Sequence, residues 1–148
     1  MILALSLLSV AQAGPTSGFR GTFCGGNSSH CPIVQIGMAY VNNRFGVRVG
    51  GSPLPVPLGF NIGLQYYFSE AEQDKRYFVG TSAGGSISGF YDFAAIGVHG
   101  GVDFHLSEDR KTIFTPRLGV DYVGSSGLIT TRETSFRPTV SVEIARAF

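Results

Sequence analysis

Two cysteines and a histidine lie close together near the start of this 148-residue chain. Cys24 and Cys31 flank the stretch GGNSSH, which ends in His30. Thiolates and imidazoles bind zinc, but two cysteines and one histidine at this spacing make a poor tetrahedral ligand set. In an oxidising compartment the same two cysteines would instead close a small ring at the tip of a hairpin. We therefore predict a Cys24–Cys31 disulfide and no metal site.

A second group that could do chemistry is Ser82, in the stretch GTSAG at residues 80–84. This stretch matches G-x-S-x-G, the nucleophile elbow of α/β-hydrolases, which requires a strand, a sharp turn and a helix. The residues that follow, GSISGF, have the pattern of more strand and turn. The chain is also too short for that fold, so we do not expect Ser82 to be a nucleophile.

A third candidate is the pair His105 and Ser107 in FHLSED. This H-x-S spacing resembles the catalytic pair of β-barrel lipid A deacylases, and the resemblance implies an enzyme that acts on outer-leaflet lipid. The family has Asn after the serine, where this chain has Glu108. The strand count below also places Ser107 near the opposite leaflet. A lipid-modifying enzyme therefore stays an alternative, and we expect no catalysis and no cofactor.

The composition narrows the class of protein. A net charge of +1 gives no reason to expect nucleic-acid binding. Charged residues make up 14% of the chain, against roughly 25% in soluble domains. Much of the surface is therefore expected to face something other than water. The length corresponds to one domain.

The chain begins with an apolar run, MILALSLLSVAQAG. The run ends in Ala11-Gln12-Ala13, the small-x-small pattern of a signal-peptidase site. A membrane-spanning helix needs about 20 residues, so this run is too short to be one. We predict a signal peptide over residues 1–13 and a mature domain over 14–148.

The rest of the chain alternates with a period of two, which indicates β-strands. Several predicted strands approach or exceed the roughly nine to eleven residues that span a bilayer. Short charged connections alternate along the chain with connections rich in Gly, Ser, Pro and Thr, as in an up-and-down meander. The fold class we predict is an all-β, up-and-down antiparallel transmembrane β-barrel of about eight strands. The strands expected are 18–24, 33–41, 44–51, 57–68, 76–88, 92–106, 112–124 and 136–148.

Each strand has one apolar and one polar face, and two architectures fit that pattern. On 57–68, Phe60, Ile62 and Leu64 oppose Asn61 and Gln65. In a secreted soluble barrel, the apolar side chains would surround a cavity for a small apolar ligand. In a membrane barrel they would face lipid, and the polar side chains would fill the lumen. Small residues on the polar face and aromatic residues near strand ends favour the membrane barrel.

The chain closes on FRPTVSVEIARAF, in which Val140, Val142, Ile144 and Phe148 share one parity. This strand resembles the C-terminal signature of bacterial outer-membrane β-barrels, which their insertion machinery reads, although Arg146 departs from it. Length and meander are similar to the small eight-stranded OmpA-transmembrane-domain and OmpX group. The resemblance implies a location in the outer membrane of a diderm bacterium, with lipid and the barrel-assembly machinery as partners.

The same resemblance implies where the connections lie and what the protein does. Both termini would be periplasmic, and the Cys24–Cys31 loop would be external, together with three other loops. A structural or surface-interaction role follows, in which the external loops contact partners at the cell surface.

An eight-stranded barrel is just wide enough for its own side chains, and buried charges must be paired. We therefore predict a lumen plugged by ion pairs rather than an open, porin-like channel; a gated narrow pore is the alternative. Pairing of the last two strands would bring Arg117 opposite Glu143 and Asp121 near Arg137, with Asp103 diagonal to Arg117. The predicted network comprises Arg48, Asp103, His105, Arg117, Asp121, Arg137 and Glu143.

Overall fold

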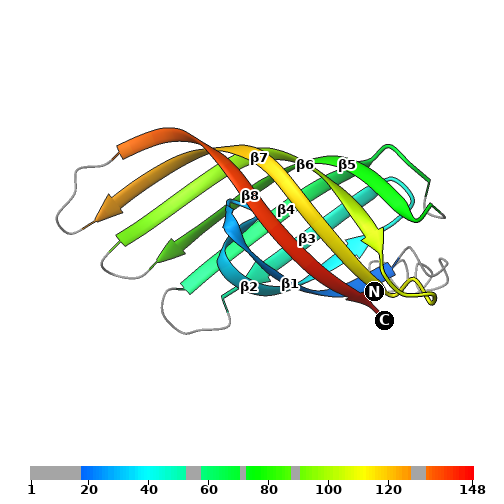
Figure 1. Ribbon diagram of the computed structural model, residues 1–148. Helices are drawn as coiled ribbons and strands as arrows, with labels where there is room; N and C mark the ends of the chain where they lie inside the picture. Colours follow the sequence, from blue (N-terminus) through cyan, green and yellow to red (C-terminus); the bar gives the residue numbers. More distant parts are fainter. Residues whose placement is uncertain (1–17, 53–57, 71–72, 88–90, 128–132) are drawn as a thin grey trace, which may run out of the picture.

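The computed structural model is a closed barrel of eight antiparallel strands, each hydrogen-bonded to its neighbours in the chain, with the first and last strands paired (Figure 1). The structure describes residues 18–52, 58–70, 73–87, 91–127 and 133–148. This confirms the predicted all-β, up-and-down antiparallel barrel. The strands are β1 (Gly18–Ser28), β2 (Cys31–Val41), β3 (Phe45–Gly51), β4 (Leu58–Tyr67), β5 (Lys75–Ile87), β6 (Tyr91–His105), β7 (Thr112–Gly127) and β8 (Glu133–Ala147).

Every end of the predicted strands lies within four residues of the observed end. Within the described ranges there is no α-helix, and hence none long and apolar enough to span a membrane. The predicted signal peptide, residues 1–13, lies outside the described residues.

The two ends of the barrel differ. The connections 42–44 and 106–111 lie at one end, together with the end of β4, the starts of β1 and β5, and the end of β8 (Figure 1). We call this the turn end. The opposite end, where β3, β5 and β7 finish and β4, β6 and β8 begin, is the loop end. The β1–β2 hairpin also points toward the loop end, but in the view of Figure 1 it finishes within the outline of the barrel.

The apolar face of every strand points outward. Phe60, Ile62 and Leu64 on β4 are 54%, 52% and 53% exposed, whereas Asn61 and Gln65 between them are buried. The soluble alternative needed the three apolar side chains around a cavity, and the structure has the opposite arrangement. The interior holds charged side chains instead: Arg20, Arg48, Arg76, Asp103, Arg117, Asp121 and Glu143.

A small apolar cluster lies in the interior near the turn end. It consists of Val41, Tyr67 and Phe78, with Tyr67 and Phe78 in ring contact at 5.4 Å. The guanidinium of Arg76 lies 4.1 Å from the centre of the Tyr67 ring and donates to the carbonyl of Asn43. A cation over an aromatic face is stabilised by the ring quadrupole. We call these four side chains the floor.

Glycine allows the backbones of β6 and β7 to approach closely. A Cβ on Gly119 would lie 2.5 Å from the carbonyl oxygen of Val98 and 2.9 Å from the Cβ of His99. Both obstacles belong to the neighbouring strand and cannot rotate away. Gly100 on β6 has more room, because the nearest atom to its Cβ would be the Phe78 carbonyl oxygen at 3.6 Å.

Gly119→Ala is therefore expected to lower the free energy of unfolding by about 1–3 kcal/mol, the usual cost of forcing atoms into a packed site. Gly100→Ala is the matched control and should show no loss. Urea unfolding of the purified folded proteins measures both. Equal stability of the two variants would contradict the close contact between β6 and β7.

Candidate functional site

The centre of the lumen contains a carboxylate shared by two arginines. Glu143 on β8 lies 2.6 Å from Nε of Arg48 on β3 and 3.3 Å from Nη2 of Arg117 on β7. All three side chains are buried. Charges in such a place are tolerated only when they are paired and hydrogen-bonded. The three strands are therefore tied together through one group.

A second ion pair lies between this cluster and the floor. Nη1 of Arg20 on β1 is 3.1 Å from Oδ2 of Asp103 on β6. Asp103 also accepts hydrogen bonds from the hydroxyls of Thr115, at 2.8 Å, and Tyr67, at 3.0 Å. The carboxylate is thus bonded on both oxygens by groups from three other strands.

The tip of the β1–β2 hairpin lies inside the lumen, and we define the tip as residues Ser28–Cys31. The backbone N–H and the hydroxyl of Ser29 both donate to Asp121 on β7, and the same hydroxyl is 2.8 Å from the hydroxyl of Ser82 on β5. The backbone carbonyl of His30 accepts a hydrogen bond from Arg48 at 2.8 Å. Nε2 of the His30 imidazole lies 3.3 Å from the carboxylate of Glu143. A segment bonded to β3, β5, β7 and β8 at once must lie within the barrel.

The position of the tip corrects one expectation and confirms another. Residues 24–31 were expected to form an external loop, but both strands continue into this stretch and the tip is buried. The reason is that its hydroxyls and imidazole find partners on the inner wall. The Cys24–Cys31 disulfide is confirmed.

The predicted network residues do not all come together. Arg48, Arg117 and Glu143 form one cluster, and Asp103 is paired with Arg20 rather than with Arg117. Asp121 bonds to Ser29. Arg137 lies opposite Asp121 in the ladder, but its side chain is exposed and its Nε donates to Ser135 at 3.0 Å. His105 lies at the turn end, 3.3 Å from the carbonyl oxygen of Asp74.

The interior groups missed from the sequence include Arg20, Arg76, Ser29 and His30. Arg20 lies on the polar parity of its strand, between the outward Phe19 and the buried Thr22, so the alternation was a usable signal. Ser29 and His30 gave no such signal, because they stand in a polar stretch that reads as a surface loop.

The serines considered as nucleophiles are engaged in other contacts. Ser82 is buried and bonded to Ser29, and its hydroxyl is 3.5 Å from Nδ1 of His99. Ser107 donates to Asp109 and accepts from the backbone N–H of Thr112 at 3.1 Å. The bond from Ser107 holds the pKa of the Asp109 carboxyl below its usual value. These contacts make Ser107 part of a turn.

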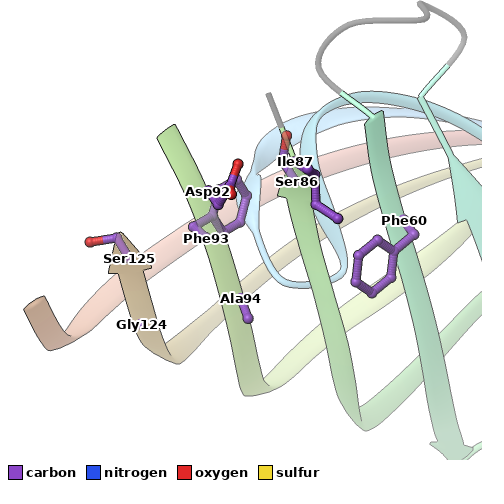
Figure 2. Close-up of a pocket in the computed structure, with 8 residues that line it drawn as sticks. All are labelled: Phe60, Ser86, Ile87, Asp92, Phe93, Ala94, Gly124 and Ser125. Atoms are coloured by element: carbon purple, nitrogen blue, oxygen red, sulfur yellow. The ribbon is translucent and has the colours of Figure 1, made fainter. Parts of the chain in front are cut away.

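A cavity of about 560 Å³ lies at the loop end between β4 and β7 (Figure 2). Phe60 and Ile87 reach it from the outer face of the wall, whereas Ser86 and Ser125 are buried on the inner face. It thus crosses the rim of the barrel and is separate from the charged cluster. The other lining residues are Asp92, Phe93, Ala94 and Gly124.

The chain matches no known family model, no curated protein and no solved structure at a significant level.

Replacement of Glu143 tests the charged cluster. Glu143→Gln keeps the size of the side chain but leaves two buried arginines without their shared carboxylate. Removing one partner of a buried ion pair typically costs about 3–5 kcal/mol, and we expect a loss of that size in urea unfolding. Arg137→Gln is the control. Because this side chain is exposed, its replacement should change the free energy of unfolding by no more than about 0.5 kcal/mol. Similar losses in both variants would refute the importance of the cluster.

Proposed function

We propose that this chain is a small outer-membrane β-barrel protein of a diderm bacterium. Its role is structural or one of surface interaction, its lumen is closed by polar contacts, and it catalyses no reaction. The observation that carries the proposal is the distribution of side chains, apolar outside and charged inside. In water this arrangement would expose a large apolar surface, whereas in a bilayer it buries that surface in lipid.

The height of the apolar surface suits a bilayer. On β7 the outward face is apolar from Phe114 to Tyr122, with Leu118 and Val120 between them. Eight residue steps correspond to about 26 Å along a strand, or roughly 20 Å of height at a tilt of about 40°. Membrane barrels have an apolar band about 25 Å tall. The band of this barrel is comparable, which supports immersion in lipid.

Aromatic side chains mark both edges of this band. They pair across neighbouring strands with ring centres between 5.1 and 6.5 Å apart. Membrane barrels carry such aromatic girdles at both interfaces, where an amphipathic ring meets lipid on one side and water on the other. The pairs are Phe19–Tyr40, Phe45–Tyr66 and Phe104–Phe114 toward the turn end, and Tyr122–Phe136 toward the loop end.

The partners we propose follow from the apolar band, the outward face of β8 and the loop end. Lipid contacts the band, and the barrel-assembly machinery reads β8, whose outward face carries Val140, Val142 and Ile144 and is followed by the exposed Phe148. Arg146 interrupts this apolar series, with its guanidinium 3.5 Å from the Thr112 hydroxyl near the turn end. Long cationic side chains reach the interface from such positions. Surface partners would contact the loop end.

Fractionation followed by a gel with and without boiling tests the membrane proposal. A folded membrane barrel should be found in the outer-membrane fraction and stay compact in detergent until it is heated, because its strand ladder is closed. We expect faster migration before boiling than after it. A protein found in the soluble fraction, with one mobility under both conditions, would refute the proposal.

A matched pair of substitutions distinguishes lipid from water at the band. Leu118 is 68% exposed in the middle of the band, and Leu106 is 64% exposed at the turn end. In lipid, Leu118→Arg should cost about 2–4 kcal/mol of folding free energy, against about 0–1 kcal/mol for Leu106→Arg near the interface. Urea unfolding in phospholipid vesicles measures both. If neither substitution lowers stability, the band faces water.

A further inference from the structure

The β1–β2 hairpin bends sharply toward the lumen. Cys24 lies opposite Gln35 in the ladder, whereas Cys31 lies opposite Ser28. Four residue steps separate these two rungs, so a straight hairpin would place the cysteines about 13 Å apart. Their Cα atoms are 6.2 Å apart, and the disulfide joins them. The bond therefore closes the concave side of the bend and fixes the hairpin in its inward position.

The wall of the barrel is shaped for the tip. A Cβ on Gly84 of β5 would lie 2.2 Å from the carbonyl oxygen of Ser29, and one on Gly63 of β4 would lie 3.2 Å from Nδ1 of His30. Any larger residue at Gly84 would collide with the tip. Near Gly63 and Gly84, the tip thus fills a space that side chains of the wall fill in an ordinary eight-stranded barrel.

The groups around the tip are polar. Asp121 and Ser82 bond to Ser29, and Arg48 and Glu143 bond to His30. If the tip left the lumen, these four side chains would line the space it vacates, with the Arg48–Glu143 pair intact. Charged and hydroxyl groups can be hydrated, whereas a cavity lined by apolar groups would stay dry.

We propose that the tip is the plug of a passage for small inorganic ions, and that the Cys24–Cys31 bond is its latch. This inference rests on the proposed membrane location and adds a conditional pore to it. Opening of the latch requires a thiol reductant. Two thiols of the reductant give two electrons and two protons to the disulfide, which becomes two cysteine thiols, and they form a disulfide of their own. The bend is then held by hydrogen bonds alone.

Conductance of potassium chloride across planar phospholipid bilayers tests the plug. The oxidised wild-type protein should show little current above leak. Dithiothreitol, added after insertion, should raise the conductance by about tenfold or more. Without the tip, the side chains of the wall do not fill the lumen, and water and ions can enter the space that remains. The variant Cys24→Ser with Cys31→Ser should conduct from the outset and not respond to the reductant, so it controls for other effects of dithiothreitol.

A second variant removes the plug without relying on the bond. Deletion of residues 27–32, combined with Cys24→Ser, leaves Gly25 and Val34 as the last rung of the hairpin. Gly26 and Ile33 would then form a two-residue turn of the Gly-X kind that suits a type II′ hairpin. We expect this variant to conduct with or without reductant.

The outcomes separate the two proposals. Heat-dependent mobility and recovery from vesicles show for each protein whether it folds and inserts. Failure of the wild type to insert would refute the membrane proposal. An inserted deletion variant that conducts no more than the wild type would overturn the plug. A deletion variant that conducts, beside a wild type that stays closed after thiol titration has shown both cysteines to be reduced, would overturn the latch.

Discussion

Glu143 is the group on which the interior of this barrel depends. Its carboxylate lies on β8, contacts arginines from β3 and β7, and meets the imidazole of His30 from the hairpin tip. A buried charge has few acceptable arrangements, because its loss of hydration must be offset by partners at hydrogen-bond distance. The register of these strands, the position of the tip and the charges of the lumen are therefore mutually constrained.

The strands could be predicted because their signal is local. A period of two is visible within ten residues, and it identified eight strands and the face of each that is polar. The outward position of Phe60 beside the buried Asn61 is an example. The cysteine pairing was also predictable, since it needs only two residues and a short ring.

The candidate site was less predictable, because parity gives the face of a residue and not its height in the barrel or its partner. Arg137 has the parity of Glu143 but lies nearer the loop end, where it is exposed. The inward bend of the hairpin left no trace in the alternation. Serine, asparagine and glycine are as typical of a surface loop as of a filled lumen, so only the contacts with four distant strands reveal the location of residues 28–31.

The pairing of β1 with β8 has a consequence for the order of assembly. That ladder joins Arg20 to Ala147, nearly the full length of the described chain, whereas the ring of the disulfide closes over a separation of 7 residues. Short rings close with far less loss of chain entropy than long ones, and non-local strand pairing is slow. We expect the bent hairpin to form first and the sheet to close around it, so that the tip is already inside when β1 and β8 pair and does not have to enter a finished barrel.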